Sequence, residues 1–310
     1  MMVSEMMSET LANEKLTTED LTYEEFKDCL PEVIGNYLPA EYWDANIYVE
    51  QLEKVGCVID KLIIRPKESN IGIAVSLNGL WENSKKFSNS NIFEEIAKMV
   101  IQSLENIPKQ DFLFKKAATG KIDRKTILNT VVFSLGSQNN SAEFLQKTVH
   151  RKFLNLVLFY RLVGENCSIV VTQNMISDLG ITEAELYAHA KINTEEKLPG
   201  TIISMVEFLP FLPDEFPAYI LTNEKKNYGA SVILDELFLE MVGRKLGCNY
   251  YVLPSSIHEV IVVPADVEAD MLFQMVREIN ETAVAPEDFL SDSVYLYDRE
   301  KRQLSIACEK

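Results

Sequence analysis

The sequence predicts an α+β protein in which a mixed, largely antiparallel sheet packs against helices, with a smaller α+β part near the N-terminus. Strand-like apolar runs lie in neighbouring groups joined by short turns, and capped helical stripes alternate with them. Hydrophobic residues make up 47% of the 310 residues, which is ordinary for a globular protein. A chain of this length can bury a sizeable core in one large or two medium domains.

Composition divides the chain into three expected parts. Residues 1–20 are polar and rich in Met, Glu and Thr without a sustained period, which predicts a disordered acidic leader. The stretch Gly136–Ser141, GSQNNS, predicts a loop and a soft boundary. We therefore expect an N-terminal α+β part over residues 21–140 and a C-terminal α+β part over residues 141–310.

The N-terminal part alternates helix and strand patterns. Thr22 and Glu25 have the spacing of a capping box, which predicts the start of a helix, and Pro31 is expected to kink or split that helix. An apolar stripe predicts a second helix over 92–104. Strands are expected at 46–51, 58–64 and 71–77, irregular chain at 105–119, and a third helix at 120–134.

The C-terminal part shows clearer strand patterns. Leu156–Phe159 is apolar at every position, so the strand over 154–162 should be central and covered on both faces. The turn at 164–166 predicts a hairpin to a return strand over 167–172. Further strands are expected at 249–253, 259–263, 294–297 and 304–307, and helices at 144–152, 182–194, 201–208, 231–246 and 265–280.

Two of these helices carry more specific expectations. The helix over 231–246 should end at Gly247, because glycine is the usual residue just beyond a helix C-terminus. The helix over 265–280 has apolar residues at helical spacing, which are expected to face inward: Met271, Leu272, Met275, Val276 and Ile279.

Charge disfavours a nucleic-acid-binding protein. The net charge is −17, and residues 1–60 hold 14 acidic and 3 basic side chains. Binding to nucleic acid depends on Lys and Arg neutralising phosphates. The basic segment at 109–152 leaves a small exception open. The acidic first 60 residues leave a different and weaker hypothesis, in which the chain mimics nucleic acid for a basic partner.

Cysteine usage and hydropathy predict a soluble cytoplasmic protein. The five cysteines are odd in number, widely spaced and without a CxxC pair, so they indicate neither a zinc site nor a disulfide framework. The acidic N-terminus is not a signal peptide. No run approaches the roughly 18–20 apolar residues of a membrane span. We expect no metal or other cofactor.

Chemically reactive residue types gather between two of the expected strands. Ser255, Ser256, His258 and Glu259 contain the types of a nucleophile, a base and an orienting carboxylate. Side chains alternate along an extended backbone, so Ser256 and His258 should share one face while Ser255 and Glu259 share the other. This pattern places His258 and Glu259 apart.

One interpretation is a hydrolase or transferase that uses Ser256 or Ser255 with His258. Its orienting carboxylate would come from elsewhere, such as Asp292 or Glu287. The common hydrolase motif GxSxG is absent, and no second histidine follows His258 at the spacing of a zinc peptidase.

The simpler interpretation is structural. Residues 254–256 then form a turn between strands, and His258 hydrogen-bonds to a neighbour. This favours a non-enzymatic intracellular accessory or interaction protein with an unknown protein partner. A deep pocket lined by this segment, with the imidazole bound at both nitrogens, would instead favour an enzyme.

Several stretches are similar to one known family. They are TYEEF near Tyr23, YLPAEYWDANIYVEQ, LIIRPKESNI, VTQNMISDLGITEAELYAHAKINT, LTNEKKNYGAS, LPSSIHEVIVVP and VREINETAVAPEDFLSDSVYLYD. On these motifs the chain resembles an uncharacterised bacterial family, domain of unknown function fifty-six eighty-eight, whose members occur mostly in gut anaerobes. The middle of the chain departs from that pattern at Val149-His150 and at 154–156. The resemblance implies a shared fold and brings no known activity.

Overall fold

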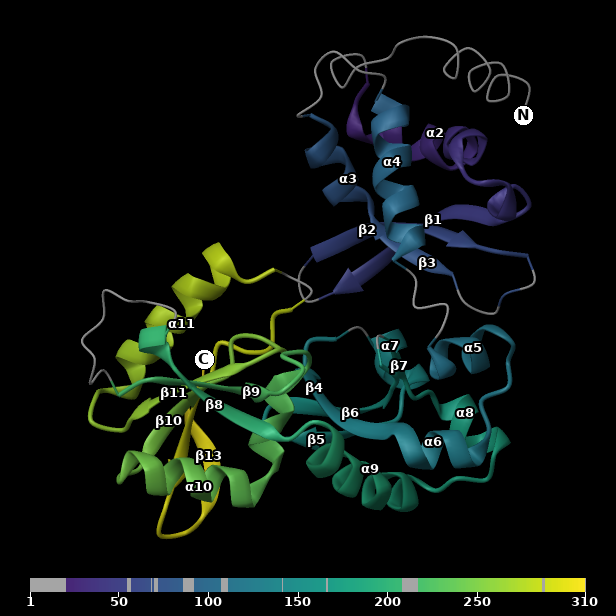
Figure 1. The fold of residues 1–310 in the computed structure, drawn as a ribbon. Helices are drawn as coiled ribbons and strands as arrows, with labels where there is room; N and C mark the ends of the chain where they lie inside the picture. The colour runs from purple at the N-terminus through teal and green to yellow at the C-terminus, as the bar shows by residue number, and fades with distance from the viewer. Residues whose placement is uncertain are drawn as a thin grey trace. The chain divides into compact units, whose positions relative to one another are not determined.

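The structure is a computed structural model, and it confirms the α+β class (Figure 1). Two compact units divide the chain: unit 1 comprises residues 1–122 with 165–167, and unit 2 comprises 123–164 with 168–310. The leader expected over residues 1–20 lies outside the described residues, which are 21–54, 57–67, 69, 72–85, 92–106, 111–140, 142–165, 167–207, 217–285 and 288–309.

Unit 1 is a three-stranded antiparallel meander with helices packed on one face of its sheet (Figure 1). The three expected strands and the helix over 92–104 are confirmed. The buried core joins Phe26 and Leu30 from the first helix, Leu62 and Ile64 from the middle strand, and Ile96 from the last helix. The elements are α2 (Tyr23–Ile34), β1 (Asn46–Lys54), β2 (Cys57–Arg65), β3 (Ile73–Ser76), α3 (Leu77–Ser84), α4 (Ile92–Glu105) and α5 (Phe112–Ala118).

The expected capping box begins α2. The Glu25 amide donates to Thr22 Oγ1 at 3.3 Å, and the Thr22 amide donates to Glu25 Oε2 at 2.8 Å. Pro31 lies inside one continuous helix, so the split considered at this position does not occur. Buried Leu30 and Val33 on either side of Pro31 hold both halves against the core.

Helix α5 corrects the expectation of irregular chain at 105–119. Asp111 is its N-cap, with Oδ1 accepting from the Leu113 amide at 2.7 Å. Leu113 and Ala117 are buried on its inner face. A helix of seven residues makes only about two turns, which is too short to show a helical period in the sequence.

One buried carboxylate ties helix and sheet together in unit 1. Asp60 accepts from Tyr23 Oη at 2.8 Å, Gln51 Nε2 at 2.9 Å and Lys27 Nζ at 3.0 Å. Burial by itself would raise the pKa of Asp60, but the hydrogen bonds from Gln51, Lys27 and Tyr23 outweigh it and lower that pKa below 3.8. Asp60 therefore stays ionised in the folded protein at neutral pH.

Unit 2 begins with a four-stranded antiparallel sheet centred on β6 (Leu156–Val163), as expected for that strand. Residues 156–160 are buried, and β6 pairs with β4 (Val131–Ser137), β5 (His150–Phe153) and β7 (Ser168–Val170). The helices of this part are α6 (Arg124–Thr130), α7 (Ala142–Lys147), α8 (Gln173–Asp178) and α9 (Glu183–Lys197).

Strand β4 corrects the expected helix over 120–134. Only residues 124–130 are helical, and 131–137 form a fully buried strand. Helix α9 covers the free edge of this strand: the Phe133 amide donates to Thr194 Oγ1 at 2.9 Å, and Asn193 Nδ2 donates to the Val131 carbonyl at 2.8 Å. Since its partners β6 and α9 come later in the chain, 123–140 belongs to unit 2, and the units divide before the boundary drawn at residue 140.

The second sheet of unit 2 has six antiparallel strands in the order β13-β12-β10-β11-β9-β8. The expected short helix over 201–208 is wrong, since residues 200–204 form edge strand β8 and 205–207 a 3₁₀ turn. The expected terminal hairpin is confirmed as β12 and β13. The strands are β8 (Gly200–Ser204), β9 (Tyr219–Asn223), β10 (Tyr250–Leu253), β11 (Val260–Pro264), β12 (Val294–Asp298) and β13 (Gln303–Cys308).

Helix α10 (Glu236–Leu246) lies on one face of this sheet. A 3₁₀ segment, η4 (Gly229–Leu234), occupies the start of the expected helix over 231–246, and Asp235 is the N-cap. Gly247 ends α10 with φ +76°, which confirms the expected C-cap. The phenol of buried Tyr250 donates to the Leu239 carbonyl at 2.9 Å and stacks at 4.9 Å on Tyr297.

Helix α11 (Ala269–Ala283) lies on the opposite face, against Leu253 of β10 and Val294 of β12. Leu272, Phe273 and Val276 face the sheet. Met271, Met275 and Ile279, which were expected to face inward, are exposed. The apolar positions of this helix span more than one face, and a helix on a flat sheet buries only one of them. Among the described residues, no helix combines the length and apolar character needed to cross a bilayer.

The paired tyrosines of the six-stranded sheet make a matched stability test. Tyr297 Oη is buried without a hydrogen-bond partner in the described part of the chain, whereas Tyr250 Oη has one. We expect Tyr250→Phe to lower the free energy of unfolding by about 1 kcal/mol, and Tyr297→Phe to leave it unchanged or raise it. Urea unfolding followed by circular dichroism measures both, and an equal loss in the two variants would contradict this assignment.

Asp60 predicts acid sensitivity in unit 1. Because its folded pKa is lowered, the ionised carboxylate stabilises the fold above the ordinary value of 3.8, and this contribution disappears as pH falls through the folded pKa. Asp60→Asn should lower the free energy of unfolding by about 2 kcal/mol at pH 7 and much less at pH 3. Tryptophan fluorescence reports this unit, since Trp43 and Trp81 lie in it.

The matched control is Asp28→Asn. Asp28 is exposed on the same helix that carries Lys27, and its substitution removes the same charge. Equal effects from the two substitutions would show that total charge, and not the buried network, stabilises unit 1.

Candidate functional site

The predicted polar segment, residues 254–259, connects β10 to β11 and pairs along its length with residues 288–291. The Ser291 amide donates to the Pro254 carbonyl at 3.0 Å, and the Leu290 amide donates to the Ser255 carbonyl at 3.0 Å. The Ile257 amide donates to the Asp288 carbonyl at 2.8 Å, and Ser256 and Phe289 form a bridge. The segment is therefore a paired stretch of backbone and not a free loop.

A third segment, between β9 and η4, closes over the same place. Thr222 Oγ1 donates to the His258 carbonyl at 2.8 Å, and the Ala230 amide donates to the Ile257 carbonyl at 3.2 Å. Gly229 lies between them: a Cβ there would be 2.1 Å from Thr222 Oγ1 and 2.4 Å from the His258 carbonyl oxygen. Only glycine fits this contact.

The imidazole of His258 is bound at both nitrogens. The Tyr228 amide donates to Nδ1 at 3.2 Å, and Nε2 lies 3.2 Å from Asp288 Oδ1. A backbone amide N–H only donates, so Nδ1 is the acceptor. Nε2 therefore carries the ring proton and donates a hydrogen bond to the Asp288 carboxylate. The Tyr228 ring lies 5.6 Å from the imidazole and has the Arg161 guanidinium over it at 3.9 Å.

Ser256 lies close to His258, but within the described part of the chain no hydrogen bond joins its hydroxyl to the imidazole. Its Oγ accepts from the His258 backbone amide at 3.0 Å, which is a tight local turn. The side chain is buried, with 6% of the residue exposed. Ser255 is partly exposed and makes no side-chain hydrogen bond within the described part of the chain. Neither hydroxyl is positioned to give its proton to the imidazole.

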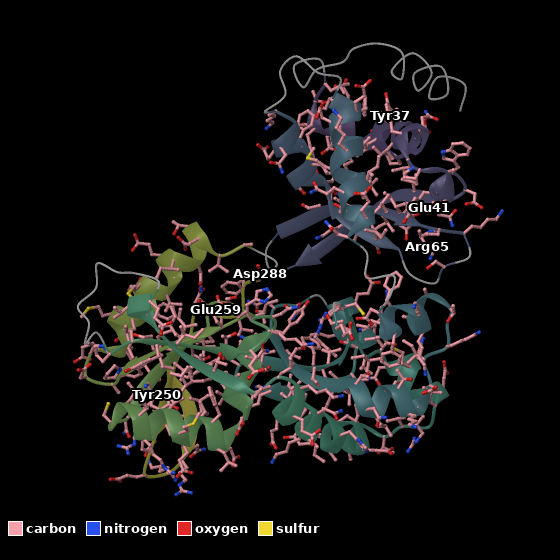
Figure 2. All side chains as sticks on the ribbon, in the orientation of Figure 1. Tyr37, Glu41, Arg65, Tyr250, Glu259 and Asp288 are labelled. Atoms are coloured by element: carbon pink, nitrogen blue, oxygen red, sulfur yellow. The ribbon has the colours of Figure 1, made fainter. Side chains whose placement is uncertain are left out.

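The carboxylates are placed differently from the sequence expectation. Asp288, and not Asp292, orients His258, while Asp292 accepts from Asn280 Nδ2 at 2.7 Å. Glu287 lies outside the described residues. The Glu259 carboxylate makes no hydrogen bond or ion pair within the described ranges. Figure 2 shows Asp288 and Glu259 at this end of unit 2.

Sequence reasoning missed Tyr228 and Asp288 because each reaches His258 across about thirty positions in the chain. A signal was present, since LTNEKKNYGAS, LPSSIHEVIVVP and VREINETAVAPEDFLSDSVYLYD are three of the stretches that carry the family resemblance. Their meeting point in the structure is the His258 segment.

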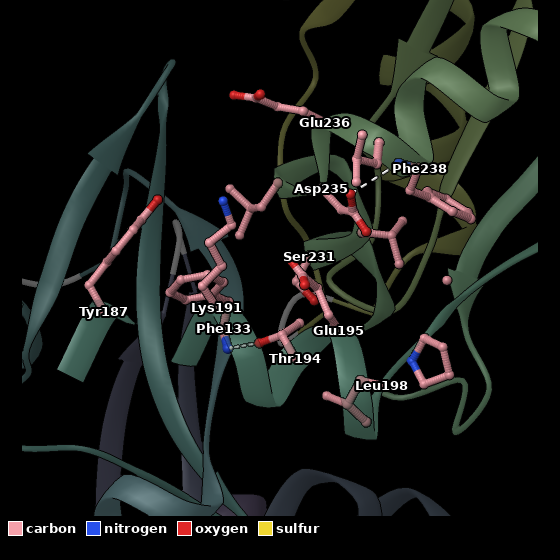
Figure 3. Close-up of a pocket in the computed structure, with 15 residues that line it drawn as sticks. Phe133, Tyr187, Lys191, Thr194, Glu195, Leu198, Ser231, Asp235, Glu236 and Phe238 are labelled. Carbon is pink, nitrogen blue, oxygen red and sulfur yellow. Dashed lines mark hydrogen bonds between the residues drawn. The ribbon is translucent and has the colours of Figure 1, made fainter. Parts of the chain in front are cut away.

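A pocket lies elsewhere in unit 2, between α9, β4, η4 and the start of α10 (Figure 3). Its volume is about 230 Å³, smaller than the roughly 300 Å³ at which most small-ligand sites begin. Phe133, Tyr187, Leu198 and Phe238 form its apolar walls, and Lys191 lies at its lining as well. None of the predicted site residues lines it. Over the residues that the structure describes, no group of three or more His, Cys, Asp and Glu side chains could hold a metal ion.

Comparisons with known proteins give a family and no activity. A family model described as a Family of unknown function (DUF5688) matches residues 23–299. The match begins at the first residue of α2 and includes all three segments that meet at His258. No curated protein and no solved structure matches the chain.

The contact at Gly229 predicts a large stability loss on substitution. In Gly229→Ala the new methyl group would overlap the His258 carbonyl, Thr222 and the Asn223 amide, so the free energy of unfolding should fall by about 3 kcal/mol. Gly180→Ala is the control: Gly180 has φ +60° with nothing within 4 Å of a Cβ, and should lose only about 1 kcal/mol. Urea unfolding compares them, and a smaller loss at Gly229 would contradict the close contact.

Proposed function

The chain belongs to the Family of unknown function (DUF5688), and we propose that it acts inside the cell as a non-enzymatic protein that binds a protein partner. One observation carries this proposal. The Ser256 hydroxyl accepts from a backbone amide and makes no hydrogen bond to the imidazole within the described residues, although both nitrogens of His258 are bound, and the pocket described above is lined by other residues.

The chemistry of a serine nucleophile explains why these contacts matter. A general base needs a free lone pair within hydrogen-bond reach of the hydroxyl proton. The lone pair of His258 Nδ1 accepts from Tyr228, and Nε2 carries a proton. A substrate would also have to reach Ser256, which is buried. The hydrogen bonds of His258 and Ser256 therefore fit residues that hold the backbone of this segment in place.

The cysteines support a location inside the cell. Cys29 and Cys248 are free thiols in the described structure. Free, partly buried thiols without disulfides are typical of proteins in a reducing compartment. The proposal places the chain in the cytoplasm on this ground.

Exposed apolar side chains support the binding of a partner. On α10, Leu237 and Met241 are exposed at a spacing of one turn, and on α11 Met271, Met275 and Ile279 repeat that spacing. Contiguous exposed apolar side chains on a helix are uncommon on a monomer and often mark interaction surfaces. Because these side chains are exposed, they contribute little to the core, and contact with a partner would bury them.

A second candidate function is a hydrolase or transferase that uses Ser256 or Ser255 with His258. The pair between His258 Nε2 and Asp288 Oδ1 favours it, because a carboxylate orients the imidazole in many serine enzymes. In that geometry, however, the nitrogen opposite the carboxylate must accept the serine proton, and here it accepts from Tyr228. The candidate therefore requires a rearranged loop.

Covalent labelling decides between the two candidates. A fluorophosphonate probe, which modifies activated serines, should leave Ser255 and Ser256 unlabelled in the full chain, because neither is activated by a free base. Intact-mass measurement and peptide mapping check this, with a serine hydrolase of known activity labelled in parallel. Labelling that disappears in Ser256→Ala or in Ser255→Ala would overturn the non-enzymatic proposal.

A further inference from the structure

Helix α11 covers only part of its sheet face. Its buried residues pack on β10 and β12 through Leu253 and Val294, and Ile261 and Val263 of β11 pack against the same cluster while staying partly exposed. The Cys308 thiol donates to Asp270 Oδ1 at 3.2 Å, so the Asp270 side of the helix lies over β13, at the sheet edge. The strands beyond β10 on the other side are β11, β9 and β8.

An apolar stripe lies on the flank of α11 away from Asp270. Successive helical residues turn by about 100°, so residues four apart drift slowly around the axis and form a slanted ridge. Met271, Met275 and Ile279 have this spacing, and they are 65%, 44% and 39% exposed. The falling exposure shows that the stripe descends toward the sheet at Ile279.

The sheet beside this flank is apolar and partly exposed. Ile261 of β11 pairs with Ile220 of β9, which pairs with Ile203 of β8. Ile261 is also paired with Leu253, so the row lies on the face that carries α11. All three isoleucines are partly exposed. We call these isoleucines, together with Met271, Met275 and Ile279, the α11 surface.

Carboxylates without cationic partners surround the α11 surface. Glu259 directly precedes β11, two residues before Ile261, Glu268 is the N-cap of α11, and Glu278 is one turn from Met275. None of these three forms an ion pair within the described ranges, whereas Glu281 on the same helix pairs with Arg277. The surface therefore combines an apolar centre with an uncompensated acidic border.

We propose that the α11 surface binds an amphipathic helix of another protein whose polar face is basic. Such a helix would lie on the row of isoleucines beside α11, with apolar side chains against the methionines and Lys or Arg against the acidic border. The inference rests on the proposed binding function and specifies its partner.

Charge selects this occupant over others. A second copy of the chain, with a net charge of −17, would bring the same acidic border against its own. Like charges brought together in this way oppose association. Nucleic acid and anionic membranes are repelled for the same reason. Met-rich apolar surfaces adapt to different helical partners because the methionine side chain is unbranched and flexible.

Fluorescence anisotropy with the full chain tests this inference. The probe is a labelled synthetic peptide of about five helical turns, made of Leu and Lys with Leu at i, i+3, i+4 and i+7. Two control peptides are a scrambled sequence of equal charge and a version with Glu in place of Lys. We expect the amphipathic basic peptide to bind at least about tenfold more tightly than either control.

Substitutions at exposed positions assign the binding to this surface. Met271→Gln with Met275→Gln should weaken binding about tenfold, while Met241→Gln, at a comparably exposed position on α10, should not change it. Glu278→Gln should weaken binding less and reduce its dependence on salt. Circular dichroism should show that all variants remain folded, because the substituted side chains are exposed.

Several results would overturn the inference. In the anisotropy experiment, these are equal binding of the three peptides or no binding of any of them. In the substitution experiment, they are an affinity that the methionine substitutions leave unchanged, or a dimer of this chain that dissociates in Met275→Gln. These failures are separate from that of the proposed function, which serine labelling alone would overturn.

Discussion

The close contact between Gly229 and the His258 carbonyl is the constraint on which one end of unit 2 depends. Three segments distant in the chain meet there: the exit of β9, the link between β10 and β11, and residues 288–291 before β12. A side chain at position 229 would push Thr222 and His258 apart. Because Thr222 donates to that carbonyl, the order of β9 beside β11 depends on the same contact.

This constraint explains why residues with catalytic potential have structural roles. The link between β10 and β11 carries buried polar groups, and each buried polar group needs a partner. Ser256 Oγ accepts a hydrogen bond from the His258 amide. The imidazole accepts from the Tyr228 amide and donates to the Asp288 carboxylate. The imidazole thus adds a side-chain link between the Tyr228 loop and Asp288, which Ile257 also joins through its backbone.

The two faces of the six-stranded sheet differ in a way that bears on function. On one face, α10 and the stacked pair of Tyr250 and Tyr297 cover the sheet closely. On the other, α11 packs over β10, β12 and Ile261 of β11, and Ile220 and Ile203 farther along the sheet are partly exposed. The incompletely covered face carries unpaired carboxylates as well.

Local patterns predicted those parts of the fold that local interactions decide. The capping box at Thr22, the C-cap at Gly247, the three-stranded meander and the terminal hairpin are each stabilised by residues close in sequence. The errors occurred where distant partners decide. Residues 131–137 begin with two β-branched valines and are otherwise a mixture of apolar and small residues that does not specify a strand, and pairing with β6 makes them one. Residues 200–204 become a strand because β9 lies beside them.

The candidate site shows the same division. The amino-acid order places Ser256 two residues before His258, and a local hydrogen bond from the His258 amide to Ser256 Oγ keeps them close, whereas the expected turn at 254–256 is a stretch paired with residues 288–291. Which nitrogen of His258 meets Asp288, and which flank of α11 meets the sheet, depend on the packing of whole elements. A helix with apolar residues on two flanks can bury either one, and only the sheet beneath it selects between them.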